Sequence, residues 1–298
     1  MKNSGVGQRC AVRRGSGAES APLELTVPAE LLNPDHTFSC GQTFRFHQEG
    51  DRWYGIAYGS LLEIVREGRL VRMAVHGSDR PREAWRRYFD LDCDYAALFR
   101  EADPVLKTAV GTAPGLRVLT QEPFEMLISC ILSANNNIPR ITRIVEALCT
   151  EAGREFIVEG RTLHAFPEPE QLAGLNESRL RALGTGYRAP YILASAERAA
   201  ADDLTALRDR PTPEVLAHLQ TYPGVGPKVA GCIALFALGK RDAFPADVWI
   251  RRIVRELYGF NGPPAALQAF ATRQFGENAG IAQQFLFHYA RRHLRAGS

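Results

Sequence analysis

The chain has 298 residues, 45% of them hydrophobic, and carries a formal net charge of +3 with an isoelectric point of about 8.6. This length suits one large domain or two ordinary ones, and the apolar content supports a buried core. The mild basicity permits a polyanionic partner without requiring one. The longest apolar run, residues 229–238, is too short to cross a membrane, which excludes a membrane-spanning role.

Residues 1–21 are rich in glycine, serine and arginine and contain no apolar stretch. This composition predicts a disordered tail and excludes a secretory signal peptide. A basic, acid-poor start is also compatible with an organelle transit signal, but a tail is the favoured interpretation.

Residues 38–75 show a pattern typical of strands. Apolar residues alternate in short pieces, and Glu49-Gly50-Asp51 and Glu67-Gly68-Arg69 separate these pieces as turn candidates. The spacing predicts antiparallel strands joined by tight turns. We therefore assign residues 22–105 to an N-terminal antiparallel β-sheet domain.

From Arg82 onward the apolar period becomes helical. Within residues 124–132 the apolar positions repeat at i, i+3, i+4, i+7 and i+8. Further helical faces follow at residues 141–148, 215–222, 250–257 and 282–289. Strands first and helices after them predict an α+β fold, in which residues 106–298 form a helical catalytic domain with a helix-hairpin-helix at about 212–239.

The six cysteines are scattered, and none forms a C-x-x-C pair or lies near a histidine cluster. We therefore expect no disulfide framework, no zinc site and no cysteine-ligated iron–sulfur cluster. Scattered thiols are typical of a reducing compartment.

The helix-hairpin-helix is built around YPGVGPK, residues 222–228. Thr212 and Pro213 are typical of a helix cap and first helical position, and we expect this helix to end at Tyr222. Two glycines then allow a tight reversal, and Pro227 starts a second helix whose first N–H groups suit a phosphate. Judged by spacing alone, the favoured interpretation is an ordinary turn between two helices, with Lys228 exposed to solvent.

Lys228 and Asp247 are the candidate catalytic pair. A lysine near a helix N-terminus and other cationic groups is expected to have a lowered pKa, which makes its free amine available for attack on an electrophilic carbon. Asp247 stands just before the helical run at Ile250. A plain helix cap is the strong alternative for Asp247, and a cap can also aim its carboxylate at a developing positive charge.

Five segments of the sequence, taken in order, carry a specific signal. They are SCGQTFRF (39–46), SCILSANNNIPRITRIVEALC (129–149), LGTGYRAPYI (183–192), LQTYPGVGPKVAGCIALFAL (219–238) with AFPADVWIRRI (243–253), and GIAQQFLF (280–287). Together they resemble the 8-oxoguanine DNA glycosylases of the helix-hairpin-helix superfamily. The resemblance covers roughly residues 38–293, and although many DNA-binding modules contain such a hairpin, the five segments together are specific.

The resemblance implies a bifunctional DNA glycosylase and AP lyase of base-excision repair, acting on double-stranded DNA that contains 8-oxoguanine. The damaged base would be flipped out of the duplex. Lys228 would attack the sugar C1′ and form a Schiff base, Asp247 would stabilise the transition state, and Gly224, Val225 and Gly226 would bind a DNA phosphate. A monomer without an organic cofactor is implied, with a hairpin whose carbonyls are able to bind a cation.

The resemblance also implies a lesion pocket. Gly41 would supply a backbone carbonyl that accepts the N7–H of 8-oxoguanine, a donor that guanine lacks, and Gln283 would read the Watson–Crick edge. Phe287 and Cys232 would stack on opposite faces of the flipped ring. Taken alone, Gly41 is more simply a β-bulge glycine, and Phe287 and Cys232 are core residues.

Four further residues match positions that handle the opposite strand. Asn135 would fill the gap left by flipping and contact the orphaned cytosine, which Arg140 and Arg188 would read. Tyr187 would be inserted as a wedge. Together these residues predict a preference for cytosine opposite the lesion; taken alone, the asparagines form an interhelical loop and the arginines are solvated charges.

One departure from the family and two alternatives remain. Trp249 stands where animal members carry a histidine that contacts a phosphate, and an indole offers only one neutral N–H donor. The chain could instead be a glycosylase of the same fold for another damaged purine, or a non-catalytic helix-hairpin-helix DNA-binding protein, which would need neither Lys228 nor Asp247. A bacterial cytoplasm, at the nucleoid, is the expected location, and a nuclear one stays open.

Overall fold

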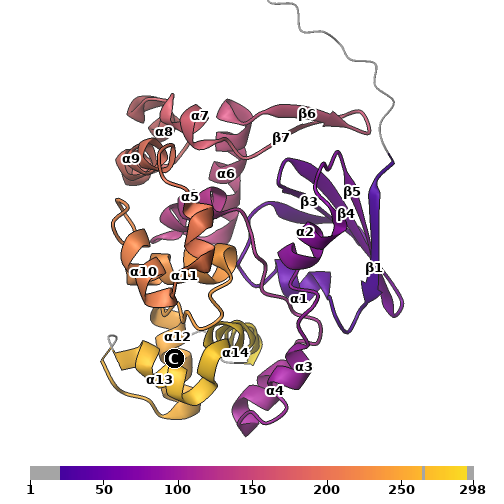
Figure 1. The fold of residues 1–298 in the computed structure, drawn as a ribbon, viewed down its shortest axis with the longest axis vertical. Helices are drawn as coiled ribbons and strands as arrows, with labels where there is room; N and C mark the ends of the chain where they lie inside the picture. The colour runs from indigo at the N-terminus through magenta and orange to yellow at the C-terminus, as the bar shows by residue number, and fades with distance from the viewer. Residues whose placement is uncertain (1–20, 264–265, 294–298) are drawn as a thin grey trace, which may run out of the picture.

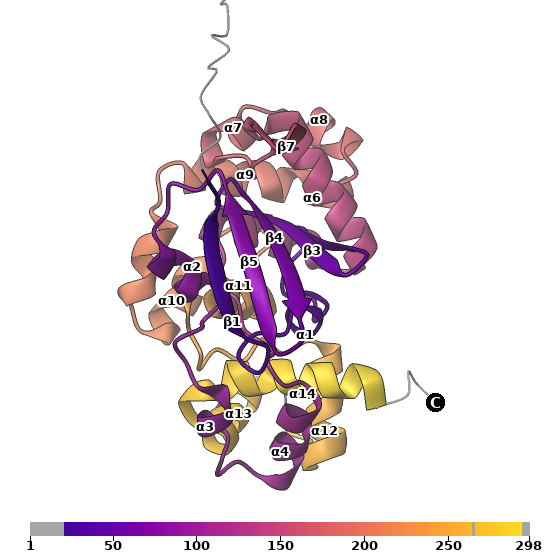
Figure 2. The same cartoon turned by 90° about the vertical axis from the view of Figure 1, so that its right-hand side faces the viewer.

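The computed structural model describes residues 21–263 and 266–293, so nearly all of the predicted tail at 1–21 lies outside the described residues. An antiparallel sheet occupies one side of the molecule and helices make up the rest, as Figure 1 and Figure 2 show. The predicted α+β fold, with the sheet first in the chain and the helices after it, is confirmed.

The sheet has five strands in the order β1-β5-β4-β3-β2, and all neighbouring strands are antiparallel. β2 to β5 form a meander whose predicted turns place Gly50 and Gly68 at a φ of 62°, a conformation that favours glycine. β1, which the sequence did not predict, pairs with β5. The strands are β1 (Leu23–Pro28), β2 (Phe46–Glu49), β3 (Arg52–Ala57), β4 (Ser60–Glu67) and β5 (Leu70–His76).

Two short helices cover the sheet and close a first hydrophobic core. They are α1 (Pro34–Phe38) and α2 (Arg82–Tyr88), and Phe38, Trp85 and Phe89 are buried against Ile64 and Met73 of the strands. The core therefore lies between one face of the sheet and these two helices.

The second, larger core belongs to the helices. Its centre is α11, whose residues from Val229 to Leu238 are all buried. The helices of this half are α3 (Tyr95–Leu98), α4 (Pro104–Thr112), α5 (Pro123–Ser133), α6 (Ile138–Ala152), α7 (Pro169–Ala173), α8 (Glu177–Ala182), α9 (Ala189–Ala199), α10 (Thr212–Leu219), α11 (Pro227–Leu238), α12 (Val248–Tyr258), α13 (Leu267–Phe275) and α14 (Ala279–His293).

The two cores do not divide at one point of the chain. Tyr95 and Phe99 of the α3 region precede the predicted domain boundary at 105/106, yet they are buried in the helical core, where both rings contact Phe285 of α14. The division of the chain into 22–105 and 106–298 stays a prediction.

A hairpin that the sequence did not predict joins the two halves. β6 (Glu155–Val158) and β7 (Arg161–His164) leave the helical half and extend toward the sheet, at the top of Figure 1. A second connection is Arg45, whose buried guanidinium donates to the Cys149 thiol and the His164 carbonyl, each at 2.7 Å. These contacts hold the sheet half against α6 and β7.

Helix boundaries near the hairpin differ in part from prediction. α10 begins at Thr212, but the Thr212 hydroxyl donates to Asp242 instead of capping the helix, and the helix ends at Leu219 rather than Tyr222. Pro227 starts α11 as predicted. In the part of the chain that the structure describes, every helix is too short or too polar to span a membrane.

Candidate active site and DNA-binding surface

Lys228 lies in the first turn of α11, partly buried, with its Nζ 3.5 Å from the hydroxyl of Ser133 at the end of α5. Cys232 follows one helical turn later on the same face, and Cys130 of α5 lies beside it. Lys228 also interacts electrostatically with Asp247. Three elements therefore bring an amine, two thiols and a carboxylate together.

These neighbours raise the pKa of Lys228 above its ordinary value. The largest cause is the charge of the Cys232 thiolate, followed by burial, which opposes it, and by Cys130 and Asp247. The predicted lowering of this pKa is therefore wrong for the protein without DNA. The groups nearest the amine are potential anions, whereas the prediction assumed cations.

Cys232 responds in the complementary direction. Its pKa is lowered to about 7, first through its hydrogen bond with Cys130 and then, against the effect of burial, through the charge of Lys228. Each charge thus stabilises the other, which favours an ammonium–thiolate pair. Proton transfer from Nζ to Sγ would give a neutral amine and a thiol, a pair that further burial favours because desolvation penalises both charges.

Asp247 is the N-cap of α12, as the sequence predicted. Its Oδ1 accepts from the Ile250 N–H at 2.8 Å, which fixes the carboxylate at the helix start. One oxygen caps the helix and the same group interacts with Lys228, so capping leaves the carboxylate available to the amine.

The hairpin presents exposed backbone to solvent. Gly224 has a φ of 80°, and a Cβ there would lie 3.1 Å from Tyr191, so this position requires glycine. Gly226 precedes α11 and provides no side-chain cap, which leaves the first N–H groups of the helix without a side-chain partner. Val225 is buried between the two glycines. This is the geometry of an anion site at a helix N-terminus.

The asparagine run between α5 and α6 has divided roles. Asn136 donates to the Leu132 carbonyl at 3.0 Å, and Asn137 caps α6 by accepting from the Arg140 N–H at 3.0 Å. Asn135 is exposed and has a φ of 49°, an uncommon backbone conformation for a residue with a side chain. Asn136 and Asn137 use their side chains within the protein, whereas the Asn135 side chain makes no hydrogen bond to the described residues and is left for a partner molecule.

Tyr187 and Arg188 come together at this asparagine loop. The buried guanidinium of Arg188 donates to the carbonyls of Ala134 and Asn135 and stacks 4.4 Å from the Tyr187 ring centre. Tyr187 itself is 52% exposed. Arg140 is exposed on the first turn of α6, and its guanidinium has no partner among the described residues.

Gly41 lies in the loop between α1 and β2, so the β-bulge interpretation is wrong. Its φ is 79°, and a Cβ would lie 3.6 Å from Ile138 at the start of α6. The sequence also missed Gln42, which is fully buried. The Gln42 amide donates to the carbonyls of Thr37 and Arg117, and it accepts from the Leu119 N–H at 2.8 Å. These bonds fix the backbone next to Gly41.

Gln283 and Phe287 lie one turn apart on α14, the first buried and the second half-buried. Arg291, one turn further on, donates to the Ser39 carbonyl at 3.2 Å, and its guanidinium is 5.7 Å from the Phe287 ring centre. The loop that carries Gly41 is thereby attached to the helix that carries Gln283.

Comparison with known proteins gives a consistent assignment. Residues 24–127 match the family model of the 8-oxoguanine DNA glycosylase N-terminal domain, and residues 128–274 match that of HhH-GPD superfamily base excision DNA repair proteins. The N-glycosylase/DNA lyase of Arabidopsis thaliana is 35% identical over 290 residues, which cover 89% of this chain and 79% of the relative. The chain belongs to the 8-oxoguanine DNA glycosylases.

Two further relatives of this glycosylase extend the comparison. A probable N-glycosylase/DNA lyase of Methanothermobacter thermautotrophicus is 36% identical, over 78% of this chain and 82% of the relative. The solved structure of the Clostridium acetobutylicum 8-oxoguanine glycosylase/lyase, with double-stranded DNA containing cytosine opposite 8-oxoguanine, has a TM-score of 0.83 and 33% identity, covering 88% of this chain and 92% of that one. The predicted family is confirmed.

Exposed apolar side chains mark a candidate DNA-binding surface on this glycosylase. Eight large ones are exposed in the described residues, and five belong to segments with predicted site residues: Ile138, Tyr187, Tyr191, Val248 and Trp249. Single exposed apolar residues need no explanation, but five in segments that contain predicted site residues favour an interaction surface there.

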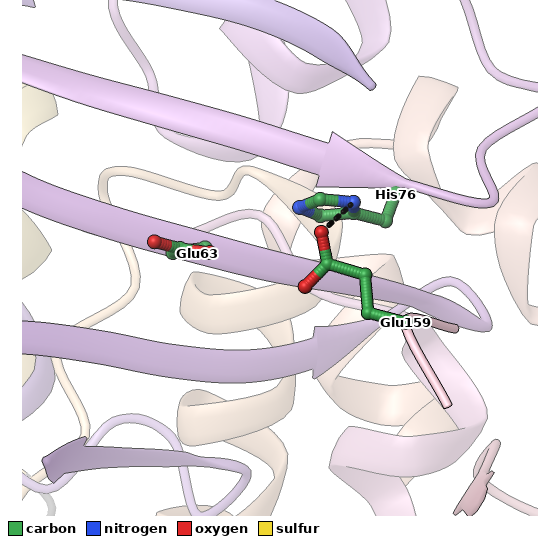
Figure 3. Close-up of side chains that lie close together, drawn as sticks. All are labelled: Glu63, His76 and Glu159. Carbon is green, nitrogen blue, oxygen red and sulfur yellow. Dashed lines mark ion pairs between the residues drawn. The ribbon is translucent and has the colours of Figure 1, made fainter. Parts of the chain in front are cut away.

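The described residues contain one group able to hold a metal ion. Glu63 of β4, His76 of β5 and Glu159 of the β6–β7 turn place their ligand atoms within 4.8 Å of one another. His76 and Glu159 form an ion pair at 3.5 Å, drawn in Figure 3, and Glu63 is also paired with Arg52. The His76–Glu159 pair joins the sheet to the hairpin, the Arg52–Glu63 pair links β3 to β4, and neither involves a residue of the helix-hairpin-helix.

Proposed function

We propose that this glycosylase excises 8-oxoguanine from double-stranded DNA and then cleaves the strand through a Schiff base on Lys228. The observation that carries the proposal is the placement of the Lys228 amine beside Asp247 and the Cys232 thiol, at the starts of α11 and α12. The relatives named N-glycosylase/DNA lyase, and the neighbour with 8-oxoguanine in its DNA, support the substrate and both activities.

The reaction begins with a proton transfer inside the site. Lys228 gives a proton to the Cys232 thiolate, and its amine then attacks C1′ of the flipped nucleotide. The Nζ–C1′ bond forms as the C1′–N9 bond breaks, and the base leaves with the bonding pair and takes the proton back from the Cys232 thiol, which becomes a thiolate again. Asp247 stabilises the positive charge that develops on the sugar.

Strand cleavage follows from the same adduct. Opening of the sugar ring gives a protonated imine between C1′ and Nζ, which acidifies the C2′ proton. Loss of that proton breaks the C3′–O bond, and the 3′ phosphate leaves with the bonding pair. Water then hydrolyses the imine and returns the free amine of Lys228. The nucleophile belongs to the protein, so this chemistry requires no organic cofactor.

The pocket residues read the lesion. The Gly41 carbonyl accepts the N7–H of 8-oxoguanine and repels the N7 lone pair of guanine, while Gln283 pairs with the Watson–Crick edge. Phe287 and Cys232 contact the two faces of the ring. The attachment of the Gly41 loop to α14 through Arg291 supports this shared pocket.

The asparagine loop and its neighbours handle the opposite strand. Asn135 enters the gap in the duplex, Tyr187 is the wedge beside it, and Arg140 and Arg188 read cytosine. Arg188 uses most of its donors on backbone carbonyls, so it also holds Asn135 in place for this contact. A preference for cytosine opposite the lesion follows.

The remaining features concern binding and location. The exposed backbone of Gly224, Val225 and Gly226 binds a DNA phosphate, and the hairpin carbonyls are the place for a bound cation. We expect a monomer, because one chain carries every proposed group. The free cysteines of the described residues support a reducing, DNA-containing compartment, the nucleoid of a bacterium or a nucleus.

Borohydride trapping tests the proposal. The protein is mixed with a duplex bearing 8-oxoguanine opposite cytosine, then with borohydride, and a covalent complex is sought on a denaturing gel. We expect an adduct with the lesion duplex that is absent with a guanine duplex and absent in Lys228→Gln. Lesion binding without any adduct would reject the Schiff-base mechanism. Duplexes with other opposite bases test the cytosine preference in the same assay.

A further inference from the structure

A cavity of about 200 Å³ lies beside the Gly41 loop, between the end of α1 and the last turns of α14. It is separate in its lining from the Lys228 site. The residues that line it are Ser39, Cys40, His288, Arg291 and Arg292.

His288 is the unusual member of this lining. It is only 5% exposed, and neither of its ring nitrogens has a hydrogen-bond partner in residues 21–263 and 266–293. Buried polar groups in native proteins are nearly always hydrogen-bonded, so an imidazole that faces a cavity with both nitrogens unpaired calls for a ligand. The ligand must offer a hydrogen-bond acceptor or donor inside the cavity.

The charges around the cavity decide which ligand fits. Arg291, Arg292 and His293 belong to α14, and His36 of α1 meets the His288 ring edge-on at 4.9 Å. Burial and these cationic neighbours lower the pKa of His288 to about 4. Of the described carboxylates, Asp35 acts on His36, and it already accepts from the Trp53 indole. The cavity therefore has a positive potential that favours an anion.

Of the two arginines that line the cavity, one already has a partner and the other does not. Arg291 donates to the Ser39 carbonyl and lies against Phe287, so it already holds the loop. Arg292 makes no hydrogen bond or ion pair within the described part of the chain and lines the cavity. A guanidinium and an imidazole in the lining of one cavity are suited to a tetrahedral oxyanion.

We propose that this cavity is a phosphate subsite in which His288 and Arg292 bind a phosphate of the DNA backbone next to the lesion pocket. The assignment of the phosphate to DNA rests on the proposed function. Ser39 and Cys40 directly precede Gly41, and His288 directly follows Phe287, so a phosphate bound here steadies both sides of the pocket.

The salt dependence of DNA binding tests the DNA source. Affinity for a duplex with a non-cleavable abasic-site analogue is measured from low to moderate salt for the wild type, Arg292→Gln and Arg100→Gln. Each lost phosphate contact lowers the slope of log K against log salt by about 0.9. We expect this loss in Arg292→Gln and none in Arg100→Gln, which removes an exposed arginine elsewhere.

Inorganic phosphate tests the subsite directly. Histidine ring NMR signals are followed while phosphate replaces chloride at constant ionic strength, with His288→Gln to assign the signal. A saturable shift of His288 that Arg292→Gln weakens, together with the reduced salt slope, supports the proposal. A shift with an unchanged slope keeps a phosphate site but overturns its assignment to DNA, and no shift with an unchanged slope overturns the subsite.

Borohydride trapping separates this inference from the proposed function. The wild type is expected to form the Lys228 adduct whether or not the subsite binds phosphate, because the subsite takes no part in the chemistry. If the wild type forms no adduct, the proposed function fails while the phosphate measurements remain informative.

Discussion

The ionisation of Lys228 is controlled by its thiol neighbours. Because the Cys232 thiolate raises the pKa of the amine, Cys232→Ala is expected to lower that pKa and increase the fraction of free amine at a given pH. We expect the acid side of the pH profile for Schiff-base formation to shift to lower pH. Borohydride trapping on a duplex with a preformed abasic site measures this shift. No base is present there, so the proposed stacking of Cys232 on the base does not affect the result.

The control for this prediction is Cys93→Ala, which removes a thiol outside the Lys228 cluster. Its profile should coincide with that of the wild type. If the acid side of the Cys232→Ala profile is unchanged or shifts to higher pH, the Cys232 thiolate does not raise the pKa of Lys228.

Single residues also show which features of the site can be predicted from the sequence and which cannot. Lys228, Asp247 and the hairpin glycines stand at helix starts and turns, whose local signals identify them. Gln42 has no such signal, because its importance comes from hydrogen bonds with Arg117, Leu119 and Gln121, which are 75, 77 and 79 residues away in the chain. Likewise, the pKa of Lys228 depends on Cys130, a neighbour that only the packing of α5 on α11 reveals.

Gln42→Leu is expected to lower both stability and discrimination. The change leaves the Leu119 N–H and two buried carbonyls without their partner, which costs about 2–3 kcal/mol of unfolding free energy. A loosened Gly41 carbonyl should reduce the ratio of kcat/KM for 8-oxoguanine over guanine. The exposed Gln48→Leu is the control, and an unaltered ratio in Gln42→Leu would separate Gln42 from lesion reading.

At the scale of elements, the sequence predicted the strands that follow one another through tight turns. It did not predict strands that stand apart from that run. β2 to β5 follow one another through Gly50 and Gly68. β1 pairs with β5, some 45 residues away in sequence, so no local turn announces it. The β6–β7 hairpin has the same Glu-Gly turn, at Glu159 and Gly160, but its strands have four residues each and lie among helices.

The hairpin between α10 and α11 allows a matched comparison of its two glycines. Gly224→Ala meets a positive φ of 80° and Tyr191, and is expected to cost about 1–2 kcal/mol of unfolding free energy. Gly226 has an extended backbone with open space around its Cβ position, so Gly226→Ala should be nearly neutral in stability. Urea unfolding of both variants checks this.

Gly226→Ala is expected to affect DNA binding more than it affects stability. A methyl group at Gly226 stands where a phosphate approaches the start of α11, so Gly226→Ala is expected to weaken DNA binding although it folds normally. Equal affinity to the wild type in Gly226→Ala would remove the hairpin backbone from the proposed phosphate contacts.

For the whole molecule, the proposed pocket needs both halves held together. Gly41 comes from the sheet half, and Lys228 and Gln283 come from the helical half. The halves meet at Arg45, at the β6–β7 hairpin and at a cavity of about 170 Å³ whose lining includes Tyr58, Glu125 and Arg154. The two halves could be predicted from the sequence, but this junction could not. The residues of the junction come from separate segments and share no sequence pattern that would indicate their contact.

The junction makes stability depend on pH through Glu125. Burial raises the pKa of this carboxyl to about 7 from 4.5, against the opposing charge of Arg45. The folded protein therefore keeps a proton that the unfolded chain has released at pH 4.5–7. By linkage, this contribution to stability is fully present below pH 4.5 and is lost as the pH rises through 7.

Glu125→Gln removes the charge that the folded state must bury at high pH. We expect the unfolding free energy at pH 8 to rise by roughly 2 kcal/mol, less than the full shift implies because the cavity admits some solvent. At pH 5 the variant and the wild type should differ little. Urea unfolding at both pH values measures this, with the exposed Glu170→Gln as control. If Glu125→Gln has the pH dependence of the wild type, the junction does not bury a protonated carboxyl.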